Sequence, residues 1–279
     1  MQNITLMVAI FNKKSLESWT RDLLSQGRYG FALDEARKAF SSQKSVAIKS
    51  ALKRLVDKGF IISIHKGYYL IIPPQYQSKG ILPPILFLDS FMQVLNRPYY
   101  LGLLSAASYH GSSHQQPQEF FVVTSFPVLR PMQKKGIKIN FISKREIPLK
   151  LLENKKTEAG YLKISNAVLT ATDLIQYAKR IGGINRVAAV LAELVENIQP
   201  SAFDNDLLEN VSVAALQRLG YLIDKVLDNQ VLASALMTLL DNNNTPLFRI
   251  PLKAAGETKG FETDELWKVI VNTSIEIDA

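Results

Sequence analysis

The stretch SSQKSVAIKSALKRLVDKGFIISIHKGYYLIIPP, residues 41–74, decides the fold of the N-terminal part of the chain. Its apolar residues recur at three- and four-residue spacing, which predicts an amphipathic helix from about Lys44 to Lys58 that stops at Gly59. Two β-rich runs follow, 60–64 and 68–72, with a short glycine-containing turn between them. This pattern predicts a β-hairpin directly after the helix.

Two shorter helices are expected upstream of this stretch. The apolar spacing that begins at Leu16 predicts a first helix, which Ser15 caps and Gly27 ends. A second helix is expected over 33–40, and the polar residues 41–43 form a turn before the third. Helix, helix, turn, helix and hairpin in this order predict a winged helix-turn-helix domain.

In such a motif the second helix lies in the major groove of DNA, with its N-terminal end deepest, while the first helix braces the backbone. The free amides at that end favour phosphate, and Gln can pair with adenine through two hydrogen bonds. A wing tip meets the minor groove or the backbone. The predicted DNA-binding residues are Ser42, Gln43, Lys44, Ser45, Lys49, Lys53 and Arg54 around the helix, and His65 and Lys66 at the hairpin tip.

The charge distribution favours the same interpretation. Residues 1–80 hold 13 Lys and Arg against 5 Asp and Glu, whereas the rest of the chain holds 20 of each, so all of the net +8 lies in the first part. A basic module joined to a neutral one is typical of a nucleic-acid-binding domain with a second, non-binding domain. The alternatives are a solvated basic surface and a winged helix that binds proteins.

The chain has 279 residues, which is typical of two domains. It contains no cysteine, which excludes disulfides, thiolate zinc sites and a cysteine nucleophile. No apolar stretch approaches the ~18–20 residues that span a bilayer, so we expect a soluble, cytoplasmic protein without membrane partners. The polar residues 76–80 read as a linker, which predicts domains at 1–80 and 81–279.

The second domain is predicted to be a mixed, mainly helical α+β domain. Its apolar pattern predicts helices at 84–95 and 99–111, strands at 120–124 and 137–142, and an extended return at 158–164. Four helices are expected later, followed by a closing strand; these segments are 171–180, 186–198, 213–227, 230–240 and 267–272. The whole chain is therefore expected to be α+β.

Four segments of the sequence resemble the AbiEi-type antitoxins, which are transcriptional regulators of type IV toxin–antitoxin systems. They are the segment 16–74, YYLGLLSAASYHGSSHQQPQEFFVVT at 99–124, TATDLIQYAKRIGGINRVAAVLAEL at 170–194, and the closing LWKVIVNTSIEID. The resemblance implies that the winged helix binds inverted repeats in double-stranded DNA of its own promoter and represses transcription. It implies that the second domain counters an AbiEii-like nucleotidyltransferase toxin, without requiring a stable complex with it.

The same resemblance directs attention to the segment 99–116 as an antitoxin surface. Its candidate residues are Tyr99, Tyr100, His110, His114, Gln115 and Gln116. His110 and His114 have a zinc-like spacing, but Gly111 ends the helix between them and further ligands are lacking, so His110 is expected to cap a helix or to bond within a polar turn. No metal, cofactor or catalytic residue is expected, and the chain is not expected to be an enzyme.

Two other functions stay open. One is a winged-helix regulator whose second domain senses a small ligand in a pocket formed by the Tyr-, His- and Gln-rich segment. The other is a metal-dependent nuclease, because the segments Glu153–Lys155 and Glu257–Lys259 fit a Glu-x-Lys pattern, although neither is expected on a strand.

Overall fold

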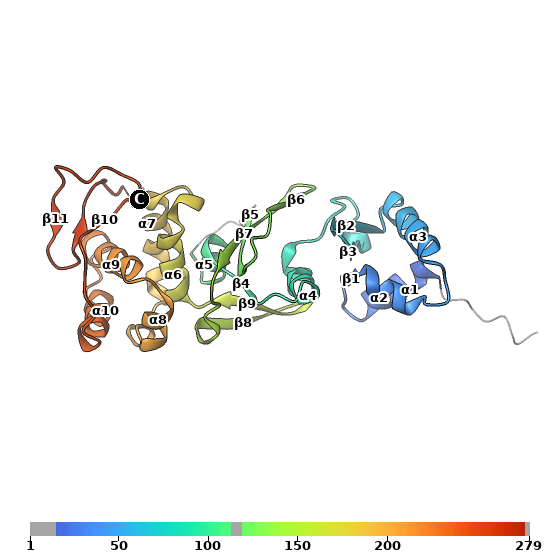
Figure 1. Ribbon diagram of the computed structural model, residues 1–279, viewed down its shortest axis with the longest axis horizontal. Coiled ribbons are helices and arrows are strands. Elements are labelled where there is room, and N and C mark those ends of the chain that lie inside the picture. Colours follow the sequence, from blue (N-terminus) through green and yellow to red (C-terminus); the bar gives the residue numbers. More distant parts are fainter. Residues whose placement is uncertain (1–14, 113–118, 277–279) are drawn as a thin grey trace, which may run out of the picture. The chain divides into compact units, whose positions relative to one another are not determined.

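The computed structural model describes residues 15–112 and 119–276, and the chain divides into two compact units (Figure 1). Unit 1 takes the residues up to Asn96 together with Lys156–Tyr161. Unit 2 takes Arg97–Lys155 and the residues from Leu162 onward. The predicted mixed α+β fold is confirmed.

Unit 1 begins with the three predicted helices and the predicted hairpin, and each lies within one or two residues of its expected bounds. The elements are α1 (Leu16–Ser25), β1 (Gly30–Ala32), α2 (Leu33–Ala39), α3 (Ser45–Asp57), β2 (Ile61–His65) and β3 (Tyr68–Ile71). The strands form an antiparallel sheet in the order β1-β3-β2. Strand β1 was not predicted, because three residues are too few to show a period.

An aromatic cluster holds the three helices against this sheet. The Trp19 ring packs edge-on against Phe31 on β1 and Phe40 after α2, with ring centroids 5.0 and 5.9 Å apart. Ile48 and Leu52 of α3 complete the core from the other side. Ser15 caps α1 as predicted, since its hydroxyl accepts from the amide of Ser18 at 3.0 Å.

Unit 1 extends beyond the predicted boundary at residue 80. Its later elements are two 3₁₀ turns, η1 (Pro74–Tyr76) and η2 (Pro84–Leu86), and the helix α4 (Leu88–Val94). The reason is packing on the hairpin: the Tyr68 hydroxyl lies 2.7 Å from Ser90 Oγ, and the Tyr68 and Phe91 rings are 5.1 Å apart. Residues 81–96 therefore group with the first unit, and the segment 76–80 is no domain linker.

The strands of unit 2 form a six-stranded mixed sheet in the order β6-β7-β5-β4-β9-β8. They are β4 (Tyr99–Leu101), β5 (Glu119–Ser125), β6 (Met132–Lys134), β7 (Ile137–Lys144), β8 (Leu152–Thr157) and β9 (Gly160–Ser165). Strands β5 and β7 run parallel over seven residue pairs, and β4 pairs antiparallel with β5. The tip of the β8–β9 hairpin is the part that groups with unit 1.

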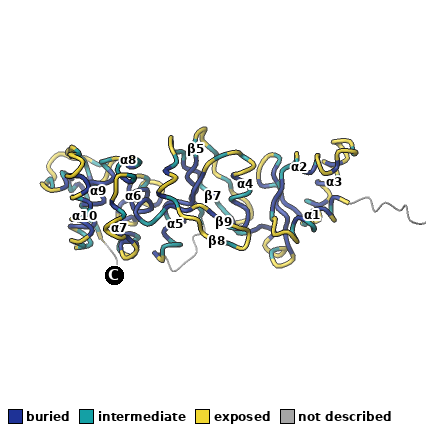
Figure 2. Tube along the Cα trace, turned by 90° about the horizontal axis from the view of Figure 1, so that it is seen from below, coloured by how far each residue is buried: buried dark blue, intermediate teal, exposed yellow. Residues whose placement is uncertain are grey.

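Helix α5 packs against this sheet, α6 and α7 contact α5, and α8, α9 and α10 follow them (Figure 1). Helix α6 is buried over eight consecutive residues, from Val168 to Ile175, because α5, α7 and α9 all contact it (Figure 2). The helices are α5 (Leu103–Tyr109), α6 (Ala167–Gln176), α7 (Ile184–Leu194), α8 (Asn205–Asn210), α9 (Val213–Tyr221) and α10 (Gln230–Asn242). A π-helical turn over Leu222–Val226 extends α9.

Short helical turns and a small C-terminal sheet complete unit 2. The 3₁₀ turns are η3 (Leu149–Leu151), η4 (Ala178–Arg180), η5 (Val195–Asn197) and η6 (Pro200–Ala202). The strands β10 (Ile250–Pro251), β11 (Thr263–Asp264) and β12 (Val269–Ile270) form the sheet. The closing strand is therefore shorter than the predicted 267–272. Among the described residues, no helix is both long and apolar enough to cross a membrane.

The prediction of one helix over 99–111 was wrong. Residues Tyr99–Leu101 form strand β4, and the helix begins only at Leu103. The chain turns at Gly102, where a Cβ atom would lie 3.0 Å from the Val123 side chain on the neighbouring strand. Pairing of Tyr100 with Val123 in the sheet overrides the helical pattern of the small residues.

Candidate nucleic-acid interface

Helix α3 has one buried and one exposed face. Ile48, Leu52 and Leu55 point into the core of unit 1. The opposite face carries a stripe at the i, i+3, i+4, i+7 spacing that places side chains on one side of a helix. This outer stripe consists of Val46, Lys49, Ser50 and Lys53, all of them exposed.

Both lysines of this stripe were among the predicted DNA-binding residues, but Val46 was not. Its side chain is 75% exposed, although it is apolar and sits in the first turn of the helix. The signal that identifies it is its spacing of three and seven residues from Lys49 and Lys53. The predicted residues Ser42, Lys44, Ser45 and Arg54 are also exposed, and Gln43 is half-buried.

The carboxylates of α1 and α2 are largely occupied by arginines. Ion pairs of 2.6–2.7 Å join Arg21 to Glu17, Arg28 to Glu35 and Arg37 to Asp34. Within the part of the chain that the structure describes, none of the four cationic residues predicted around α3 makes an ion pair; they are Lys44, Lys49, Lys53 and Arg54. The positive charge around α3 is thus not paired with the described carboxylates of unit 1.

The start of α3 also lacks the usual side-chain cap. Lys44 occupies the N-cap position, no side chain bonds to the first amides, and the first turn holds no acidic residue. A cation here opposes the helix dipole, whereas the free amides favour an anion. In unit 2, by contrast, Asn166, Asp204, Ser212 and Asn229 cap α6, α8, α9 and α10.

The predicted hairpin tip is formed, and contacts with α2 and α4 hold it in place. His65 ends β2, and Lys66 and Gly67 make the two-residue turn, in which Gly67 has a φ of 77°. The carbonyl of Gly67 accepts from the amide of Leu33 at 2.7 Å. The His65 ring lies 5.5 Å from the Phe91 ring, so Lys66 is the freer of the two predicted tip residues.

Two of the predicted antitoxin-surface residues do not lie on a surface. Tyr99 and Tyr100 are on β4 and are 4% and 0% exposed. The reason is the position of β4 inside the sheet, between β5 and β9. That prediction was wrong for both tyrosines.

His110 is the C-cap residue of α5, as predicted. Its Nε2 lies 2.8 Å from the carbonyl oxygen of Ser165, and its own carbonyl accepts from Asn197 at 2.8 Å. Hydrogen bonds of His110 therefore connect the end of α5 to β9 and to η5. His114, Gln115 and Gln116 lie outside the described residues.

A buried polar cluster around Asp173 in unit 2 was not predicted from the sequence. Tyr100 Oη donates to Asp173 Oδ2 at 2.6 Å, and Lys144 Nζ lies 3.5 Å from Oδ1. Burial raises the pKa of Asp173, while Lys144 and the Tyr100 hydrogen bond act against that rise. A signal was present, because Asp173 is the one charged residue in the helical segment 167–176.

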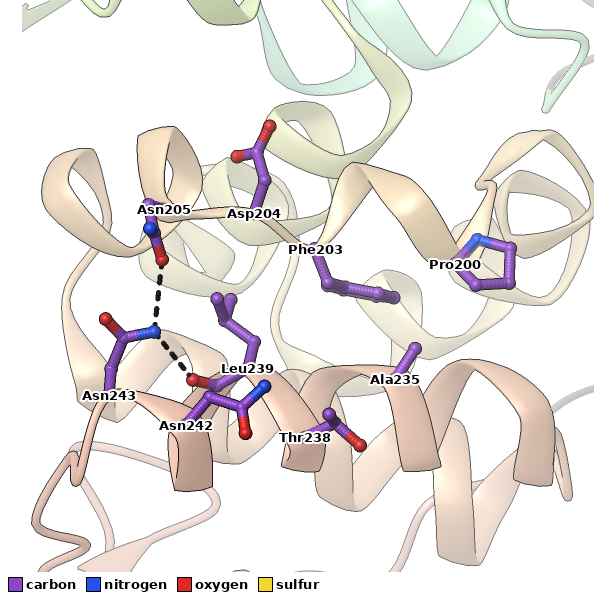
Figure 3. A pocket seen from close by; sticks show the side chains of 9 residues that line it. All are labelled: Pro200, Phe203, Asp204, Asn205, Ala235, Thr238, Leu239, Asn242 and Asn243. Atoms are coloured by element: carbon purple, nitrogen blue, oxygen red, sulfur yellow. Dashed lines mark hydrogen bonds between the residues drawn. The ribbon is translucent and has the colours of Figure 1, made fainter.

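A pocket of about 560 Å³ lies in unit 2 between the segment 200–205 and helix α10 (Figure 3). Phe203 and Leu239 form its apolar part, and Asn243 donates to Asn205 Oδ1 at 3.1 Å at one end. Tyr99, Tyr100 and His110 do not line it. The ligand pocket expected from the Tyr-, His- and Gln-rich segment is therefore not this one.

The described residues offer no group of three or more His, Asp or Glu side chains that could hold a metal ion. Glu153 and Lys155 do lie on a strand, β8, contrary to expectation. The Lys155 ammonium group stands 5.9 Å over the Tyr109 ring.

Comparison with known proteins identifies the middle of the chain. Residues 100–225 match the family model described as the AbiEi antitoxin C-terminal domain. The chain carries an AbiEi-type antitoxin domain. The resemblance to AbiEi-type antitoxins is thereby confirmed, and the domain supports an antitoxin role in a toxin–antitoxin system.

The AbiEi domain match ends before α10, but a likeness in fold covers nearly the whole chain. The crystal structure of the RV2827C protein from Mycobacterium tuberculosis has a TM-score of 0.63 and 17% sequence identity, over 90% of this chain and 89% of that one. This likeness concerns the fold alone. Among curated proteins, none matches the sequence.

Proposed function

We propose that the chain is the antitoxin and autorepressor of a type IV toxin–antitoxin system. Unit 1 binds inverted repeats in the promoter of its own operon as a winged helix-turn-helix domain and represses transcription. The AbiEi-type domain counters a nucleotidyltransferase-like toxin of the AbiEii kind, without a stable complex between the two. In this proposal the protein catalyses no reaction and acts in the cytoplasm, where promoter DNA is found.

One observation carries the DNA-binding part of the proposal, namely the exposed cations around α3. Lys49 and Lys53 lie on the face opposite the core, and neither has an ion-pair partner in the described part of the chain. Cations left without carboxylate partners favour contact with phosphate. The order α1-β1-α2-α3-β2-β3, with its three-stranded sheet, supports a winged helix in which α3 is the recognition helix and Lys66 is in the wing.

Full-length variants test the two activities separately. Truncation at residue 80 is unsuitable, because the Tyr68–Ser90 contact joins the hairpin to the segment beyond it. In this proposal the gene of a nucleotidyltransferase-like toxin lies next to that of the antitoxin. The neighbouring open reading frame is therefore expressed with wild type or with the Lys49→Ala, Lys53→Ala double variant. Growth and a promoter reporter are measured together.

We expect the neighbouring gene to be toxic, and both proteins to restore growth. Only the wild type is expected to repress the reporter. A harmless neighbour, or one whose toxicity neither protein relieves, would contradict the antitoxin role. Equal repression by both proteins would contradict the role of α3.

A second candidate function is ligand sensing by unit 2. The pocket next to α10 favours it, since its volume of about 560 Å³ lies in the range of small-molecule sites. A metabolite screen should then raise the melting temperature of the wild type, and Asn242→Leu should abolish the rise. A screen without any shift counts against this function.

A further inference from the structure

We infer that Val46 reads the 5-methyl group of a thymine in the major groove, so that the preferred DNA carries a thymine opposite the first turn of α3. This inference rests on the proposed function and adds a specificity-determining residue to it. The cations around α3 explain affinity for any DNA. Val46 supplies a contact that depends on the base.

The position of Val46 sets it among the residues that would face DNA. It lies three residues before Lys49 and seven before Lys53, on the stripe opposite the buried Ile48 and Leu52. Side chains on a helix tilt toward its N-terminus, which is the end that enters the groove deepest. Val46 therefore projects ahead of both lysines, toward the base edges, while the lysines lie farther along the helix, within reach of phosphates.

The exposure of Val46 has no structural explanation within unit 1. Its side chain is 75% exposed and packs against no member of the core cluster. A β-branched residue on an exposed helix face is less favourable than Ala. Folding alone therefore gives no reason for valine at this position, whereas contact with an apolar partner outside the chain does.

The chemistry of the major groove then indicates which group this apolar partner is. The edges of the base pairs present hydrogen-bonding groups there, and the apolar group among them is the 5-methyl of thymine. Ser45 and Gln43 beside Val46 bear hydroxyl and amide groups that suit the polar edges. Val46 suits the methyl.

The experiment removes that methyl and nothing else. A duplex selected from random DNA by the full-length wild type is rebuilt with deoxyuridine in place of each thymine in turn, and dissociation constants are measured at one salt concentration. Wild type, Val46→Ala and Val231→Ala are compared. Val231 is the matched control, because it is also the second residue of a 13-residue helix, is 67% exposed and lies in unit 2.

We expect at least one replacement to weaken wild-type binding by about fourfold, which corresponds to one buried methyl-sized group. Val46→Ala should bind the thymine and deoxyuridine duplexes nearly equally, and Val231→Ala should discriminate like the wild type. Selective binding that no replacement alters would overturn the inference and leave the proposed function standing. A wild type that prefers no duplex over random DNA would overturn both. The wild-type series needs no variant to fold.

Discussion

Tyr100 on β4 donates a hydrogen bond of 2.6 Å to Asp173 on α6. The Asp173 side chain is buried from solvent. The two residues lie 73 positions apart in the sequence, and the bond joins the sheet of unit 2 to its most buried helix. Lys144 at the end of β7 lies 3.5 Å from the other carboxylate oxygen and is itself only 12% exposed. Both Tyr100 and Asp173 belong to the segment that matches the antitoxin domain.

The buried carboxyl group of Asp173 makes stability depend on pH. Burial raises its pKa, so the folded state binds this proton more tightly than the unfolded state does. Its favourable contribution is complete below the unfolded pKa, near 4, and is lost as pH rises through the raised pKa. Urea unfolding of wild type and Asp173→Asn from pH 4 upward should show the wild type losing stability relative to the variant.

Tyr100→Phe provides the companion measurement for Asp173. It removes a hydrogen bond that lowers the pKa of Asp173, so the loss of stability should extend to higher pH than in wild type. If the free energy of unfolding of wild type instead rises relative to that of Asp173→Asn as pH increases, the ion pair with Lys144 outweighs the effect of burial on Asp173.

The contribution of Asp224 to stability should depend on pH in the opposite direction to that of Asp173. Burial alone would raise its pKa, but hydrogen bonds from Trp267, Gln230 and Lys225 outweigh burial and lower the pKa. The stability it contributes is therefore present above the unfolded pKa and lost as pH falls through the lowered one. Between pH 5 and pH 3 the free energy of unfolding should fall more steeply for wild type than for Asp224→Asn. Parallel curves would contradict this sign.

Gly220 in α9 should not tolerate alanine. In most helices the change from Gly to Ala stabilises by about 1 kcal/mol. Here the new Cβ would overlap the ring of Trp267, which is fully buried and held by its 2.9 Å hydrogen bond to Asp224. Overpacking of this kind costs about 1–3 kcal/mol, so chemical denaturation should show a net loss. In a Trp267→Leu background the same change should cost less, and an equal cost in both would place the strain elsewhere.

The sequence predicted unit 1 well because its elements are local. The helical spacing around Ile48 and Leu52 and the run on each side of Gly67 are visible in short windows, and the structure places both where they were expected. Strand β1 escaped prediction because it exists through pairing with β3.

Unit 2 was harder because distant partners decide its structure. Tyr100 looks helical among small residues, yet its pairing with Val123 makes it a strand residue. Asp173 looks like an ordinary helix residue until Tyr100 and Lys144 converge on it. Val46 escaped for the opposite reason, since an apolar residue in a helix is expected inside, and its exposure is visible only in the fold.

The salt dependence of DNA binding should identify the lysines that bind phosphate. Lys49→Ala with Lys53→Ala should weaken binding and reduce the slope of log K against log salt by about 0.9 for each phosphate that the variant no longer neutralises. Lys253→Ala with Lys259→Ala is the matched control, since both residues are exposed, lie in unit 2 and carry the same charge. If the control lowers the slope as much, net charge rather than α3 governs binding.

Gln43 tests whether the turn before α3 reads bases or only the backbone. The backbone N–H of Gln43 donates to the Phe40 carbonyl at 2.9 Å, which fixes the turn. Its half-buried side chain lies next to the start of the helix. A Gln that pairs with adenine carries sequence information, whereas a bond to phosphate carries none. Gln43→Ala should therefore lower affinity for the selected duplex by at least about fivefold, which is the low end of the range for loss of a bidentate contact to a base. Its affinity for random DNA should stay nearly unchanged. Equal reductions on both would mean that Gln43 binds the backbone, and base reading would then fall to the outer stripe of α3.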